Sequence, residues 1–191
     1  MTSLLPKLLP VSVPWMISPS VPVLRIALKG NDVPVDVTFI GFFKCDERAQ
    51  ASQNGITVID ESVSFEPSSL SIRGPFRMVK VTLTDGKCAR VVPAYSDIEV
   101  IPEKNFDWSE VKGVRQVGET PSQSVARIRD LWQSTQVCPA PGMYEVSPSS
   151  WIKELGLSGD STWHHYLFTG HDEYIEVIAK GWSWEPGQLV F

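Results

Sequence analysis

The sequence WHHYLFTGHDEYIEVIAKGWSW, residues 163–184, decides how the rest of the chain is interpreted. Two runs rich in aromatic and β-branched residues flank Gly170-His171-Asp172, and such runs on either side of a short turn are typical of paired strands. The sequence therefore predicts a β-hairpin near the carboxyl end. This stretch holds all three histidines of the chain and three of its seven tryptophans.

Two helices are expected before this hairpin. Thr120-Pro121-Ser122-Gln123 predicts a helix start, with Thr as N-cap, Pro at the first helical position and Gln able to reach back to the cap. The residues that recur on one face of this helix are Val125, Ile128, Trp132 and Thr135, with Leu131 beside them. Ser147-Pro148 opens a second, shorter helix, and Gly156 ends it.

The first hundred residues read as a largely antiparallel sheet. Two runs, 21–28 and 33–43, are separated by Lys29-Gly30-Asn31-Asp32 and predict one hairpin. Residues 76–84 and 87–94 predict a second hairpin, because Asp85-Gly86 is a strong signal for a two-residue turn. Short strands are also expected at 56–59, 63–65 and 98–101.

Together these elements predict an α+β fold: a mainly antiparallel sheet, one well-capped helix, and a carboxyl-terminal helix plus β-hairpin unit. We expect a β-rich part over residues 1–104 and a helical and hairpin part over residues 105–191, within one compact fold. Prolines at 6, 10, 14 and 19 interrupt the apolar amino-terminal segment, which predicts an irregular or edge segment packed on the body and not an export signal.

Composition limits the classes of function. The formal net charge is -5, which argues against general affinity for nucleic acid, because phosphate binding needs clustered Lys and Arg. No run approaches the roughly 20 apolar residues that span a bilayer. Three widely spaced cysteines, Cys45, Cys88 and Cys138, fit a reducing compartment, so we expect a cytoplasmic protein.

The histidines raise the question of a metal site or of acid–base catalysis. His164 and His165 are adjacent, and adjacent strand residues face opposite sides, so both cannot join one zinc site without a bulge. Asp172 or Glu173 could pair with His171 in catalysis, but exposed hairpin carboxylates usually lack the cleft and perturbed pKa that this needs. We therefore predict no metal, no cofactor and no catalytic residue. The familiar nucleophile and phosphate-loop motifs are also absent.

Charge and aromatic content favour a binding surface instead. From Asp130 onward the chain carries eight acidic residues and two basic ones, a balance that attracts a basic partner. Tryptophan and tyrosine beside acids are typical of interface hot spots, although core packing is favoured over interface use for Trp182 and Trp184. The predicted binding residues are His171, Asp172, Glu173, Tyr174, Glu176, Trp182 and Trp184.

A resemblance points the same way. The segments VCPAPGMYEV (137–146), WHHYL (163–167) and GHDEYIEV (170–177) resemble parts of small uncharacterised bacterial proteins, some of the immunity type that neutralise a toxin of the same strain. The resemblance covers roughly the final third of the chain and assigns no role to any residue. It implies a toxin as the protein partner, and the acidic residues after Asp130 predict that the partner's surface is basic.

Three hypotheses therefore remain. The first is a non-enzymatic protein-binding module, an immunity protein that covers a toxin through an acidic aromatic surface. The second is a metal-dependent or acid–base hydrolase that uses His171, Asp172 and His165. The third is a structural component of an assembly, in which the apolar amino terminus is a docking arm.

Overall fold

The computed structural model describes residues 5–18, 24–28, 35–43, 76–93, 105–170 and 173–189. The strands are β1 (Lys7–Pro10), β2 (Trp15–Ile17), β3 (Leu24–Leu28), β4 (Val35–Phe43), β5 (Phe76–Thr84), β6 (Cys88–Pro93), β7 (Met143–Ser147), β8 (His164–Thr169), β9 (Glu173–Ala179) and β10 (Gly181–Leu189). The helices are α2 (Pro121–Thr135) and α3 (Ser150–Glu154). The predicted α+β class is confirmed.

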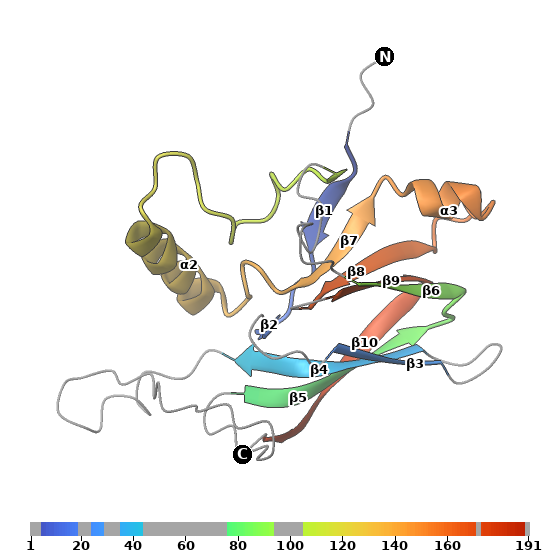
Figure 1. The fold of residues 1–191 in the computed structure, drawn as a ribbon, viewed down its shortest axis with the longest axis horizontal. Coiled ribbons are helices and arrows are strands. Elements are labelled where there is room, and N and C mark those ends of the chain that lie inside the picture. The colour runs from blue at the N-terminus through green and yellow to red at the C-terminus, as the bar shows by residue number, and fades with distance from the viewer. Residues whose placement is uncertain are drawn as a thin grey trace.

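The strands in this part of the chain form two antiparallel sheets, one above the other in Figure 1. Sheet A has the order β1-β7-β8-β9-β6, and sheet B has the order β10-β5-β4-β2, with β3 also paired to β4. Alternate residues of β4 and β5 (Val35, Val37, Phe39, Val79, Val81, Leu83) share one buried core with Met143, Tyr166, Phe168, Ile175 and Val177 of sheet A. Each of the large aliphatic or aromatic side chains buried there contributes about 1.5–3 kcal/mol.

The predicted hairpin at Asp85-Gly86 is wrong, because β5 pairs with β4 and β10 while β6 pairs with β9 in the other sheet. A type I′ turn needs positive φ at both central residues, and only Asp85 has one, at 51°. Gly86 instead lets the chain pass close to β4, since a Cβ there would lie 2.5 Å from Cγ2 of Val35. The chain changes sheets at this corner and changes back at Lys180, between β9 and β10.

The amino-terminal segment is part of the fold's core. β1 pairs with β7 at the edge of sheet A, and β2 pairs with β4 in sheet B. The Trp15 side chain is fully buried, with its ring 4.9 Å from Phe39. The predicted edge segment is therefore confirmed for residues 5–18, and this segment spans both sheets.

The outer face of sheet A carries a second apolar cluster. Leu8, Val111, Tyr144, Val146 and Leu167 are buried in it. The stretch before α2 covers this cluster, and the ring of Trp108 lies 5.8 Å from that of Tyr144. Sheet A is thus covered on both faces, which explains why β8 and β9 are nearly free of exposed positions.

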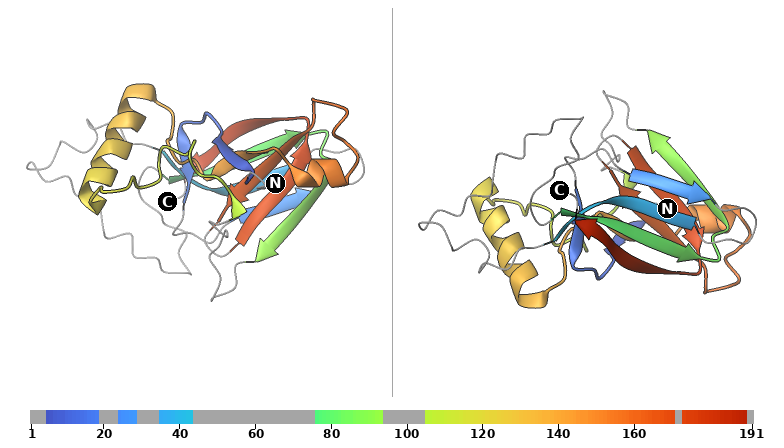
Figure 2. Two further views of the ribbon diagram at one scale, coloured as in Figure 1. Left: turned by 90° about the horizontal axis from the view of Figure 1, so that it is seen from above. Right: turned by 90° about the horizontal axis from the view of Figure 1, so that it is seen from below.

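Helix α2 begins with the predicted capping box. The Thr120 side chain accepts a hydrogen bond from Gln123 N, and the Gln123 side chain accepts one from Thr120 N. In Figure 2 the helix lies beyond the end of the strands in both views. Trp132 is buried, with its ring 6.0 Å from that of Phe42. Val125, predicted on the same face, is 66% exposed, because a helix beside the sandwich packs only a narrow strip of its surface.

The two other predicted hairpins are confirmed, as β3 pairs with β4 and β8 pairs with β9. The short helix α3 is confirmed, but its predicted start at Ser147-Pro148 is wrong: Ser147 ends β7, and the N-cap is Ser149. Gly156 follows the helix with φ 70°. The strands expected at 56–59, 63–65 and 98–101 lie outside the described residues. Among the helices in the described ranges, none is long and apolar enough to cross a membrane.

Candidate functional site

A buried polar group on the outer face of sheet A is built around His165 of β8. His165 is 4% exposed. Its Nδ1 lies 2.9 Å from Oγ of Ser149, the N-cap of α3. Its Nε2 lies 3.1 Å from Oε1 of Glu176 on β9, in a contact that is not aligned as a hydrogen bond. Because His165 lies opposite Ile178, two residues from Glu176, the strand register places both side chains on one face.

Glu176, predicted as part of an exposed acidic surface, is instead buried and 3% exposed. It faces Arg90 across the β6–β9 pair, and its Oε2 accepts a hydrogen bond of 2.5 Å from Arg90 Nε. The Arg90 side chain is 50% exposed, so the pair joins a buried carboxylate to a guanidinium at the surface. The prediction that Glu176 is exposed rested on its charge. The sequence does not indicate which elements cover this side chain.

The carboxylate of Glu176 is held in its charged form by its neighbours. Burial by itself would raise its pKa, because a low-dielectric surrounding disfavours the charge. The close contact with His165 and the hydrogen bond from Arg90, together with electrostatic attraction to both groups, outweigh burial and leave the pKa of Glu176 below its ordinary value of 4.5. At neutral pH this site therefore contains a fixed negative charge beneath Arg90.

Helix α3 supplies an aromatic wall for the same group. The cap formed by Ser149, whose Oγ accepts from Ile152 N at 3.1 Å, fixes the start of the helix. Trp151 then lies with its ring 5.3 Å from the His165 ring, edge to face. The guanidinium carbon of Arg90 lies 4.3 Å from the centre of the Trp151 ring, a cation–π distance. Ser149 therefore bonds to His165 and also positions the tryptophan.

We call Arg90, Trp151 and Tyr174 the Arg90 surface. All three side chains keep part of their area open to solvent. Tyr174 is two residues from Glu176 on the same face of β9, and its register partner is Val92 of β6. The pKa of Arg90 is raised, mainly by the hydrogen bond to Glu176 and in smaller part by charges at Tyr174 and Glu154. The Arg90 surface thus has acidic neighbours.

The predicted binding residues do not form one surface. Glu173 and Tyr174 are half-buried on β9, and Glu176 is buried below Arg90. Trp182 and Trp184 belong to β10 and pack against the sandwich core, where the Trp184 ring lies 6.1 Å from that of Trp15. The remaining two, His171 and Asp172, lie outside the described residues.

His164 and His165 face opposite sides of β8, as strand alternation predicts. The Nδ1 of His164 lies 2.8 Å from Oε1 of Glu145 on the neighbouring strand β7, and both side chains are about one-third exposed. His165 lies on the other face with Glu176. Within the described ranges, no group of three His, Cys, Asp or Glu side chains is arranged to hold a metal ion.

No family model, no curated protein and no solved structure matches this chain. Function is therefore argued from the side chains themselves.

The order Ser149, His165, Glu176 has the connectivity of a serine–histidine–acid triad. In such a triad the histidine takes the proton of the serine hydroxyl while the carboxylate stabilises the imidazolium that forms. Here the Glu176 carboxylate is also bound by Arg90, and the Ser149 hydroxyl also caps α3. Glu176 and Ser149 thus have structural roles. The Arg90 guanidinium is the more accessible part of the site.

Sequence reasoning missed Ser149, Arg90 and Trp151. A signal existed for Ser149, since Ser before an apolar helical turn is a strong N-cap candidate. Glu176 was among the predicted binding residues, and its two-residue spacing from Tyr174 indicates that both lie on one face of a strand. Nothing local pointed to Arg90, because its contact with Glu176 joins residues 86 positions apart.

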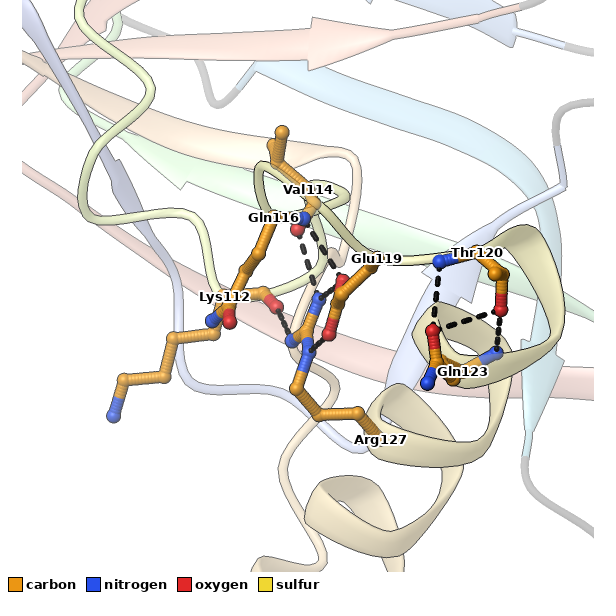
Figure 3. Close-up of polar contacts among 7 residues, drawn as sticks. All are labelled: Lys112, Val114, Gln116, Glu119, Thr120, Gln123 and Arg127. Atoms are coloured by element: carbon orange, nitrogen blue, oxygen red, sulfur yellow. Dashed lines mark hydrogen bonds and ion pairs between the residues drawn. The ribbon is translucent and has the colours of Figure 1, made fainter.

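A second polar group ties α2 to the loop before it (Figure 3). Arg127 of α2 donates from Nε to Oε1 of Glu119 at 2.6 Å and from Nη2 to Oε2 at 3.0 Å. It also donates to the carbonyl oxygens of Lys112 and Val114. These contacts use all three guanidinium nitrogens, so Arg127 fixes the loop in place and has little capacity left for a ligand.

The Arg127 contacts lead to a pH prediction. Hydrogen bonds from Arg127, and then from Gln116 N, lower the pKa of Glu119 from 4.5 to about 2. Because the folded-state pKa is depressed, the stabilisation is present above pH 4.5 and is lost as the pH falls toward about 2. NMR titration of the Glu119 carboxylate should give this low midpoint, and R127Q should move it up toward the ordinary value. An unchanged midpoint in R127Q would contradict the assignment.

One pocket of about 340 Å³ lies between α2 and the sandwich. Val11, Leu131, Val137, Cys138 and Pro139 form most of its apolar lining, with Glu110 and Lys112 among the polar residues. Glu110 is already paired with Lys7 at 2.9 Å. Burial raises the pKa of Cys138 to about 12, so its thiol is not a reactive nucleophile at neutral pH. The pocket offers space but no activated group.

Proposed function

We propose that this chain is a non-enzymatic protein-binding module that contacts its partner through the Arg90 surface. The observation that supports this most is the position of Arg90, which is half-exposed yet bound by the buried Glu176 and stacked on Trp151. Arginine, tryptophan and tyrosine are the side chains most enriched in interface hot spots. A rigid group of these three costs little conformational entropy when a partner binds.

The charge balance supports a partner with a basic surface. Glu154 is exposed and its charge acts on Arg90, and the whole chain has a net charge of -5. Such a field raises the rate at which a basic protein associates. On the resemblance of the carboxyl-terminal third, we propose an immunity protein and a toxin as the partner. The spaced cysteines support a cytoplasmic location within the same proposal.

The test compares matched arginine variants against the product of a neighbouring toxin-like gene, by calorimetry with purified proteins. R90Q and W151A should each weaken binding by tenfold or more, about 1.4 kcal/mol or above. R129Q is the control, because Arg129 is an exposed arginine of α2 that pairs with its neighbour Asp130. Equal loss of affinity in R90Q and R129Q would point to general charge, and no loss in R90Q would reject this surface.

One observation favours hydrolysis as a second candidate function, namely the 2.9 Å contact between Ser149 Oγ and His165 Nδ1. This candidate retains His165 from the hydrolase hypothesis made on the sequence. Its other two catalytic residues are Ser149 and Glu176, in place of His171 and Asp172. A serine hydrolase would react with a fluorophosphonate probe, and S149A would abolish the labelling. A binding module would show no labelling that depends on Ser149.

A further inference from the structure

The guanidinium of Arg90 has one edge engaged and one edge free. Its Nε donates to Glu176 Oε2, and its face lies on the Trp151 ring. In the described part of the chain, the two terminal nitrogens, Nη1 and Nη2, have no acidic or carbonyl partner. Since half of the side chain is exposed, the N–H groups of this outer edge are open to a ligand.

Two contacts fix the orientation of that edge before any ligand arrives. The carboxylate of Glu176 cannot move freely, because it is buried and lies 3.1 Å from Nε2 of His165. The Trp151 ring fixes the plane of the guanidinium at 4.3 Å. A planar guanidinium with a fixed direction is suited to the two parallel hydrogen bonds that a carboxylate accepts. An exposed arginine without such contacts would lose more side-chain entropy on binding.

The surrounding charges restrict which carboxylate fits. Glu154 is exposed on the end of α3, and its charge acts on Arg90 together with that of the buried Glu176. A ligand with several negative charges would be repelled by these acids, whereas lysine or arginine beside the ligand carboxylate would pair with them. Arg90 is therefore a cation beside acids, complementary to an acid beside cations.

We propose that the outer edge of Arg90 binds an acidic side chain of the partner protein that is flanked by basic residues. The inference rests on the proposed function and deepens it, because it states what the partner brings to the Arg90 surface. It also explains how a basic partner and a central arginine fit together: a basic residue meets Glu154, and the acid meets Arg90. Tyr174, whose register partner on β6 is Val92, contributes an aromatic ring to the same face.

The first test needs only the isolated protein. Acetate is titrated at constant ionic strength, with acetamide as the neutral control, and the Trp151 indole N–H and Arg90 Nε–H signals are followed by NMR. We expect a saturable shift with acetate alone. R90Q should abolish it, and R90K should weaken it about tenfold, because an ammonium lacks the planar edge. A shift that persists in R90Q, or no saturable shift in the wild type, would overturn the inference.

The second test separates the flanking charges from the carboxylate. Two blocked peptides, Lys-Gly-Asp-Gly-Lys and Lys-Gly-Asn-Gly-Lys, carry the same basic residues and differ in one group. The wild type should bind the Asp peptide about tenfold more tightly than the Asn peptide. R90Q should bind the two peptides with equal affinity. E154Q should weaken both peptides alike while leaving the acetate shift in place. Equal binding of the two peptides to the wild type would contradict a carboxylate site.

These outcomes are distinguishable from failure of the proposed function. If acetate binds but no protein partner depends on Arg90, the carboxylate site stands and the binding-module proposal fails. If a partner depends on Arg90 while acetate and the Asp peptide show no preference, the surface stands and the acid-recognition inference fails.

Discussion

Replacing Trp15 by alanine is expected to destabilise the fold by about 3–5 kcal/mol, the usual cost of truncating a fully buried tryptophan. Trp15 has no exposed area, and its ring lies against Phe39 of β4 and Trp184 of β10. It therefore joins the amino-terminal segment to two strands of sheet B. Denaturant unfolding followed by circular dichroism would measure the loss directly.

A second substitution at the same position makes the prediction sharper. The indole Nε1 of Trp15 is buried and has no hydrogen-bond partner among the described residues, and an unsatisfied buried donor costs about 1–3 kcal/mol. Trp15→Phe removes that donor together with part of the ring, so its net cost should be well below that of Trp15→Ala. Leu5→Ala is the exposed control, with Leu5 47% exposed, and should change stability by less than about 0.5 kcal/mol.

The Trp15 result also decides between two views of the amino terminus. A docking arm that waits for other subunits would tolerate Trp15→Ala with little change in the stability of the isolated chain. A core segment would not. The burial of Leu8, Val13 and Trp15 argues against the docking-arm hypothesis. If Trp15→Ala unfolded with the same free energy as the wild type, that result would support the docking arm instead.

Local signals predicted most of the secondary structure. The capping box at Thr120 and Gln123 and the turn around Gly170 act within a few residues, so they can be read from the sequence. The pairing of β5 with β10 and of β6 with β9 joins residues roughly a hundred positions apart. Asp85-Gly86 fitted a hairpin equally well on local grounds, and only the packing against Val35 shows that it forms a corner.

The candidate site was predicted less well than the fold, for the same physical reason. Alternation along β8 and β9 places His165 and Glu176 on one face, but it does not say whether that face is covered. The cover comes from α3, whose Trp151 contacts His165, and from β6, which brings Arg90. A charged residue in an alternating strand was read as exposed because charged residues usually are. Glu176 departs from the rule because it is paired.

Replacing Glu176 by alanine is expected to cost about 2–4 kcal/mol, because it removes the partner of Arg90 and His165 and leaves a cavity beneath them. The cost stays below that of a fully buried ion pair, since Arg90 is 50% exposed and can turn to water. Glu176→Leu fills the cavity and should cost less than Glu176→Ala. Glu173→Ala is the matched control on the same strand, and its half-buried side chain should matter little.

The pH dependence and the binding readout separate a structural role from a functional one. The folded-state pKa of Glu176 lies below 4.5, so its stabilisation is present above that pH and is lost as the pH falls through the folded-state value. The stability gap between wild type and Glu176→Leu should therefore narrow in acid. Glu176→Leu should also weaken the acetate response of Arg90 even where it remains folded, because only Trp151 then orients the guanidinium. A folded Glu176→Leu protein that still binds acetate like the wild type would show that Glu176 stabilises the sheet without orienting Arg90.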